Sequence, residues 1–193
     1  MDISAFYREY CCVQDKALLS ALVEKTRIRI LDKNTTVVEP GSKTEQMLLL
    51  GSGIVRSFFW GNDDRTYTDG FYSKPGTLLT FGHVSAQEQV YGMKTVSCCQ
   101  IMELSAETVA TLMEQSVAFM QMYCQLLDRM LCVQWQEKTA QYQYSSLQRY
   151  LRFLKCYPNW KGQIGSRYIA DYIGIAPESL SRLRHRLREE KNL

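Results

Sequence analysis

The sequence predicts an α+β protein, in which an antiparallel β-roll is followed by a long helix and an all-α C-terminal unit. Three observations support this class. Short apolar and β-branched runs, separated by glycine and proline, fill residues 27–104. A helical pattern of apolar side chains extends over residues 105–143. Two shorter amphipathic patterns, separated by Gly174, follow within residues 166–188.

The first thirty residues carry apolar side chains at intervals of three and four, so we expect helix there. After Lys25 the spacing changes to that of short strands. The strand-like runs lie at residues 27–31, 35–38, 47–50, 54–60, 89–94 and 97–104. Turn-forming pairs such as Pro40-Gly41 and Pro75-Gly76 separate them. Short strands at even spacing indicate a roll of the jelly-roll type with flanking helices.

The next block is predicted to be one long helix, capped by Ser105 and ending near Gln143. Two rows within it repeat every seven residues and together form a seam, as in a coiled coil. The seam residues expected to meet a second copy are Met113, Met120, Tyr123, Leu127 and Met130. A helix packed on its own roll is the alternative, because other faces carry Leu126, Leu131 and Trp135. We expect one face of this helix to pack on its own roll and another face to contact the second copy.

The stretch from Ser166 to Arg188 predicts two short helices that meet at a sharp turn. Ala170 is small where the helices cross, and Gly174 allows the backbone conformation of the corner. Pro177 suits the first turn of the second helix. The apolar stripe of that helix consists of Leu180, Leu183 and Leu187, and its opposite face is rich in arginine. This pattern is typical of a helix-turn-helix, whose second helix enters the major groove of DNA; a plain helical hairpin is the alternative.

The charge distribution also favours double-stranded DNA as a partner. Residues 145–193 contain ten Lys or Arg and four Asp or Glu, a net charge of +6. Residues 1–144 contain 13 Lys or Arg and 16 Asp or Glu, a net charge of −3. Basic charge concentrated in one segment indicates a polyanion-binding unit attached to another domain. Because one recognition helix covers few base pairs, we expect a homodimer with two such helices about 34–36 Å apart.

Several other classes of protein are not expected. No apolar run approaches the length of a transmembrane helix and the N-terminus lacks an apolar signal core, so we expect a cytoplasmic protein without a membrane partner. Seven cysteines, some adjacent and none in a C-x-x-C box, indicate reduced thiols rather than a metal or cofactor site. With two histidines and no recognisable catalytic constellation, we expect no enzyme.

The order of these parts resembles the Crp/Fnr family of bacterial transcription regulators over nearly the whole chain. The most specific segment is residues 169–182, IADYIGIAPESLSR, where the family shows Ile-x-x-x-Leu-Gly followed by Glu-x-x-Ser/Gly-Arg. Residues 39–41 and 51–56 match the turn glycines of the roll more loosely. The resemblance implies a cyclic-nucleotide-binding-like sensor domain over 1–110, a dimerisation helix over 111–144 and a helix-turn-helix domain over 145–193. It adds RNA polymerase and an unidentified small-molecule effector to the candidate partners.

The resemblance also implies which side chains contact DNA. Base contacts are expected from Glu178, Ser181 and Arg182. A guanidinium can donate two hydrogen bonds to guanine, and a carboxylate can accept one from cytosine. Phosphate contacts are expected from Ser166, Arg167, Ser179, Arg184 and Arg186.

Two departures from the family limit the resemblance. The expected effector pocket would be lined by Phe81, Gly82, His83, Gln89 and Val90, which differ from the Gly-Glu and Arg-Ser pairs of nucleotide-binding members. Because Gln89 is neutral where an Arg would bind the cyclic phosphate, cyclic AMP is not expected as the effector. The sequence ends at Leu193, where family members continue into a β-hairpin wing. An effector-binding or scaffold module that no longer reads DNA specifically is therefore the alternative.

Overall fold

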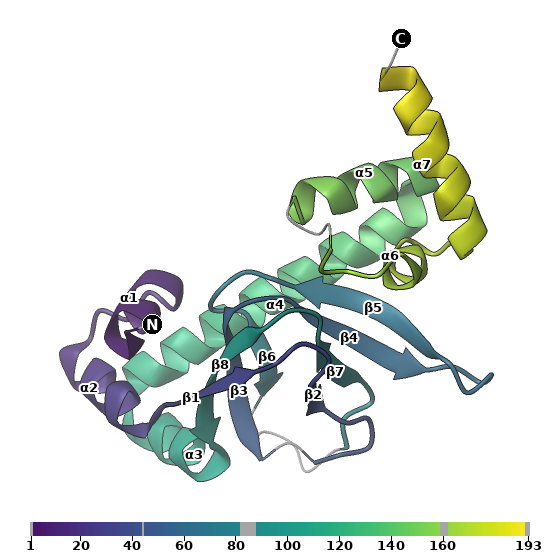
Figure 1. Cartoon of the computed structure of the whole chain (residues 1–193). Coiled ribbons are helices and arrows are strands. Elements are labelled where there is room, and N and C mark those ends of the chain that lie inside the picture. The colour runs from purple at the N-terminus through teal and green to yellow at the C-terminus, as the bar shows by residue number, and fades with distance from the viewer. Residues whose placement is uncertain (1, 44, 82–87, 159–161, 192–193) are drawn as a thin grey trace.

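A computed structural model describes residues 2–43, 45–81, 88–158 and 162–191. Two N-terminal helices, α1 (Ile3–Tyr10) and α2 (Lys16–Lys25), precede a β-roll. Five helices follow it among the described residues, and Figure 1 shows the longest of them, α4 (Val117–Gln143), running from the N-terminal helices past the roll to the C-terminal helices. The predicted α+β class is confirmed.

The roll consists of two four-stranded antiparallel sheets. The strands of the first are, in order, β1 (Arg27–Leu31), β8 (Cys99–Ser105), β3 (Gln46–Ser52) and β6 (Leu78–Phe81). Those of the second are β2 (Thr36–Val38), β7 (Gly92–Thr95), β4 (Val55–Trp60) and β5 (Thr66–Tyr72). The interior is filled by buried side chains of Val38, Leu48, Leu50, Val55, Leu79, Met93, Cys99 and Ile101. The sequence did not predict β5, which carries Asp69-Gly70 in its middle, or β6, which is only four residues long.

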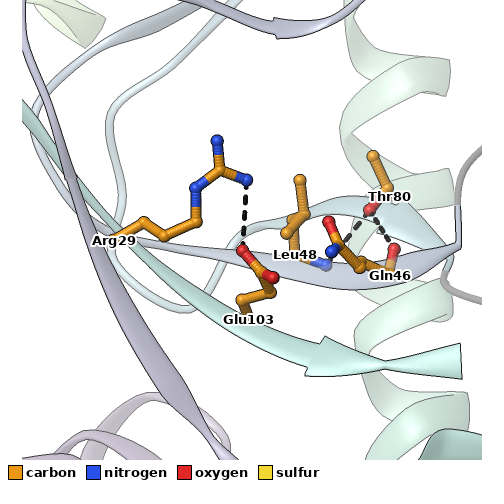
Figure 2. Close-up of polar contacts among 5 residues, drawn as sticks. All are labelled: Arg29, Gln46, Leu48, Thr80 and Glu103. Carbon is orange, nitrogen blue, oxygen red and sulfur yellow. Dashed lines mark hydrogen bonds and ion pairs between the residues drawn. The ribbon is translucent and has the colours of Figure 1, made fainter. Parts of the chain in front are cut away.

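Polar side chains hold the first sheet together across its strands (Figure 2). Arg29 on β1 donates a hydrogen bond of 3.1 Å to Glu103 on β8. The Thr80 hydroxyl on β6 donates to the Gln46 carbonyl oxygen at 2.7 Å and accepts from the Leu48 N–H at 3.1 Å. The register of β3 against β6 shifts after Leu48. Thr80 therefore satisfies a backbone donor and acceptor beside an interrupted ladder.

The prediction of one continuous helix from Ser105 to Gln143 is wrong. The chain forms α3 (Ala106–Gln115) and then α4, with Ser116 in an extended conformation between them. The Ser116 hydroxyl accepts a hydrogen bond from the Phe119 N–H, which caps the new helix. Ser116 lies seven residues before Tyr123 on the same heptad row, so its position in the repeat concealed its role as a cap.

The N-terminal helices, α3 and the first half of α4 enclose one core with the first sheet. Its fully buried side chains include Phe6, Tyr7, Leu22, Met47, Val109 and Phe119. Tyr123, predicted to face a second copy, is only 4% exposed and belongs to this core. Met113 lies on α3, and both Met113 and Leu127 pack against the same core. The predicted seam therefore faces largely inward, toward its own chain.

The C-terminal unit consists of α5 (Ser146–Cys156), α6 (Ser166–Ile173) and α7 (Pro177–Lys191). A capping box formed by Ser145 and Gln148 starts α5. Tyr150 and Phe153 are its buried residues, whereas Leu147 and Leu151 remain exposed. The buried face of α5 packs against the buried faces of α6 and α7.

Candidate nucleic-acid interface

The turn between α6 and α7 has the geometry that its sequence predicts. Gly174 adopts a left-handed conformation, with φ of 69° and ψ of 43°. The Ile175 N–H donates to the Ala170 carbonyl oxygen at 3.0 Å, and the Gly174 N–H donates to that of Asp171 at 3.0 Å. A side chain at position 174 would strain this backbone, so glycine is required where the chain reverses.

The second helix, α7, buries one face and exposes the other. Leu180 and Leu183 are buried among the residues of α5 and α6. Glu178, Ser181 and Arg182, the predicted base contacts, are all exposed. At helical spacing these three side chains share the face opposite the leucines. A Ser179 hydroxyl oxygen accepts a 3.1 Å hydrogen bond from Arg182, which orients the guanidinium along the helix.

The predicted phosphate contacts fall into two groups. Arg167 and Arg186 are exposed, and Ser179 is half-buried beside Arg182. Arg184 instead donates hydrogen bonds to the Tyr150 hydroxyl at 3.0 Å and to the Ser166 hydroxyl at 2.8 Å. Arg184 therefore ties α7 to α5 and to the first residue of α6, a structural role that the sequence did not indicate.

The N-terminus of α6 is suited to an anion. Its cap is Gly165, which offers no side-chain hydrogen bond to the first turn. The backbone N–H groups of that turn therefore keep the capacity and the partial positive charge that favour a phosphate. Ser166 and Arg167 lie on this first turn.

Arg149, a residue that sequence reasoning missed, braces the unit from α5. Its Nε donates to the Ile173 carbonyl oxygen at 2.7 Å, and its Nη1 donates to the Tyr144 carbonyl oxygen at 2.7 Å. These carbonyls lie at the C-terminal ends of α6 and α4, where a cation is favoured by the helix dipole. The only sequence signal is a basic residue near a predicted helix start, which is too common to be diagnostic.

Solved structures of bacterial regulators show the same fold. FixK2 from Bradyrhizobium japonicum matches with a TM-score of 0.73 and 16% identity over 86% of each chain. The c-di-GMP-responsive regulator CLP from Xanthomonas campestris matches with a TM-score of 0.72 and 16% identity, over 92% of this chain and 93% of that one. A Eubacterium rectale protein described as a transcriptional regulator of the Crp/Fnr family matches with a TM-score of 0.72 and 13% identity. The match covers 95% of this chain and 88% of that one. This chain has the Crp/Fnr fold. No protein-family model and no curated protein matches its sequence.

Within this Crp/Fnr fold, only part of the predicted effector pocket lies among the described residues. Phe81 ends β6, and Gly82 and His83 lie outside the described residues. The backbone of Gln89 pairs with the loop at Gly41 and Ser42. The Val90 side chain is 86% exposed and does not line the roll interior.

Two cavities instead flank α4 where it passes β5. One, of about 350 Å³, is lined by aromatic residues that include Tyr72, Trp135 and Tyr172. The other, of about 530 Å³, is lined by residues 71–78, α4, Arg152 and Tyr157. Both lie at the junction of the roll, the long helix and the C-terminal unit.

An apolar stripe on α4 is left exposed, and its residues Leu131, Trp135 and Tyr142 also border the first cavity. Its exposed residues are Val117, Met120, Leu131, Trp135 and Tyr142, with Cys124 among them. Trp135 is 58% exposed and Tyr142 is 82% exposed, which is unusual for such large side chains. Their spacing of three, four and seven residues places them along one side of the helix.

The described residues show neither of two further features. Among them, no group of three or more His, Cys, Asp or Glu side chains is placed to hold a metal ion. None of the helices in this part of the chain combines the length and apolarity needed to cross a bilayer.

Proposed function

We propose that this chain is a DNA-binding transcription regulator rather than an enzyme, and that it binds a palindromic operator as a homodimer. The observation that carries this proposal is α7. Its leucine face is buried, and Glu178, Ser181 and Arg182 extend into solvent from the opposite face. A rigidly supported helix with exposed polar side chains of this kind suits the major groove.

The proposed contacts divide between bases and backbone. Arg182 donates to the O6 and N7 atoms of guanine, and Glu178 accepts from a cytosine amino group. The first turn of α6, Arg167 and Arg186 contact phosphates and set the register. Each good base contact discriminates against a wrong base by about 1–3 kcal/mol.

The second copy is proposed to bind along α4. The exposed stripe from Val117 to Tyr142 supplies apolar area that this chain leaves uncovered. Two such helices packed side by side about a two-fold axis bury the stripe and present two α7 helices to successive major grooves. This stripe shares Met120 with the seam predicted from the heptad rows. Of the other seam residues, Met113, Tyr123 and Leu127 lie at the core of their own chain.

Footprinting of the Arg182→Ala variant tests the base readout. We expect the full chain to protect a discrete operator and the variant to lose that protection while remaining a dimer. Arg27→Ala, which removes an exposed arginine from the opposite end of the roll, is the matched control and keeps the footprint. Unchanged protection in the Arg182 variant would show that α7 does not read the bases.

A further inference from the structure

The roll and the C-terminal unit share one core. Ile54, Phe71 and Val96 of the roll are buried in the same cluster as the residues of α5, α6 and α7. The Phe71 ring makes edge contacts with Tyr157 at 5.7 Å and with Tyr172 at 5.4 Å between ring centroids. The Tyr157 hydroxyl also donates to the Phe71 carbonyl oxygen at 2.6 Å. The C-terminal helices are thus docked on β5, as Figure 1 shows for α6.

A buried arginine lies in this contact. Arg56 on β4 is only 3% exposed, although it carries a charge. Its guanidinium lies 4.0 Å from the centre of the Tyr168 ring on α6 and 4.8 Å from that of Phe58. Its Nη1 donates to the Thr68 hydroxyl at 3.0 Å. This burial lowers the pKa of Arg56.

The compensating groups come from α6. Asp171 attracts Arg56 electrostatically, and the backbone of Thr68 on β5 helps to lower the pKa of its carboxyl. Burial raises the pKa of this carboxyl, and the charges of Arg167 and Arg56 act in the opposite direction. Its Oδ2 is buried without a hydrogen-bond partner in the described part of the chain.

These groups fix α6 more narrowly than the apolar contacts do. Apolar side chains tolerate small shifts, because burial is not directional. A buried cation is different, because Arg56 would stay desolvated after losing the Tyr168 ring and the attraction of the nearby Asp171. Sliding or rotating α6 on β5 would have this consequence. Since the Gly174 turn and the buried Leu180 join α7 to α6, fixing the position of α6 also fixes the position of α7.

We propose that Arg56 is a positioning residue for DNA recognition: from the roll, it fixes α6 and so sets the spacing of operator half-sites that the dimer accepts. This inference rests on the proposed function and extends it to a residue far from the DNA-facing helix in the sequence. In the dimer, the two docked α7 helices hold one separation and one relative angle. A change of one base pair rotates a half-site by about 34–36°, so a rigid pair should discriminate spacing strongly.

The experiment compares operators that differ only in half-site spacing. The best operator is first selected from random duplexes with the full chain, and the spacing is then changed by one and two base pairs. The wild-type chain is expected to bind the altered duplexes at least about tenfold more weakly. Arg56→Met, which keeps the length of the side chain without its charge, is expected to bind all spacings within about threefold of one another.

Variants on α6 make the test independent of whether Arg56→Met folds. Tyr168→Leu removes the ring and should relax spacing in the same way. Tyr168→Phe keeps the ring and should retain wild-type discrimination. Arg56→Lys should restore part of it, and combining Arg56→Met with Tyr168→Leu should add no further loss.

The outcomes separate this inference from the proposed function. If the wild-type chain selects no duplex, the proposed function fails and the positioning role fails with it. If an operator is selected and Arg56→Met keeps the wild-type spacing profile, only the positioning role is overturned. A uniform loss of affinity at every spacing also overturns it, because that result indicates a purely structural contribution.

Discussion

Arg184 and Arg186 lie two positions apart on α7 and have different surroundings. Arg186 is exposed, whereas Arg184 bonds to Tyr150 and Ser166 and lies 5.6 Å from the centre of the Tyr150 ring. We expect Arg184→Met to destabilise the C-terminal unit by roughly 1–3 kcal/mol, because it removes charged hydrogen bonds between three helices. Arg186→Met should change the free energy of unfolding by less than about 0.5 kcal/mol.

Arg184 and Arg186 should also differ in their effect on the salt dependence of DNA binding. Arg186→Met is expected to reduce the slope of log affinity against log salt by about 0.9, as for one lost phosphate contact. Urea unfolding and salt titration of both variants measure the two effects. Equal stability of the two variants would contradict the bracing role of Arg184.

The sequence identified residue types on α7 better than it identified their contacts. Leu180, Leu183 and Gly174 were assigned correctly, because helical spacing and backbone conformation are local properties. The bracing by Arg184 and Arg149 depends on which helices lie across from them, and a single sequence does not contain that information. Arg56 was hidden for the same reason, since its partners on α6 are more than 100 residues away.

At the scale of elements, α4 carries the proposed dimer contact, and Cys124 lies on its exposed stripe. In a two-fold pair of α4 helices, the two Cys124 residues approach each other near the axis. We expect a variant that keeps Cys124 as its only exposed thiol to form a covalent dimer under mild oxidation. A matched variant that keeps only Cys132, which lines the cavity beside α4, should not. Equal cross-linking of both variants would place the interface elsewhere.

The docking of α6 on the roll should depend on pH through Asp171. Burial raises the pKa of its carboxyl in the folded chain, so ionisation of Asp171 is less favourable there than in the unfolded chain. The contribution to stability is therefore fully present below the ordinary carboxyl pKa and is lost as the pH rises through the raised value. Urea unfolding across this range should show wild-type stability falling with pH relative to Asp171→Asn. A rise relative to that variant would contradict the burial effect.

The elements also show where sequence patterns lose information. The heptad rows predicted a single helix with a seam facing a second copy. Instead, Ser116 caps a new helix and Tyr123 is buried in the core of its own chain. A periodic apolar row shows that a helix face is covered, but the same row fits a core and a partner equally well. The exposed stripe on α4 could be recognised only after the structure showed which face of α4 packs against its own chain.

At the scale of the whole molecule, buried side chains pack inside the described part of the roll, and two cavities lie beside α4 near the C-terminal helices. We expect cyclic AMP to leave the melting temperature and DNA binding of the full chain unchanged, because Gln89 provides no cation for the cyclic phosphate. A bound ligand would stabilise the chain by an amount that grows with its concentration over its Kd. A clear upward shift of the melting temperature with cyclic AMP would refute this expectation.

The order of parts along the chain was predictable, because each part has its own local spacing: strands, a long helix, then two short helices. The docking of the C-terminal helices on β5 was not, since β5 itself gave no strand signal. The fold class was therefore confirmed, whereas the contact between the roll and the C-terminal helices emerged only in three dimensions.

Selection of binding sequences from a pool of random duplexes, carried out with the full chain at physiological salt, tests the central claim most directly. The proposed function predicts enrichment of a palindrome whose half-site centres lie about one helical turn, 10–10.5 base pairs, apart. Failure to enrich any sequence, together with weak binding that varies steeply with salt, would contradict it and favour a scaffold or effector-binding module.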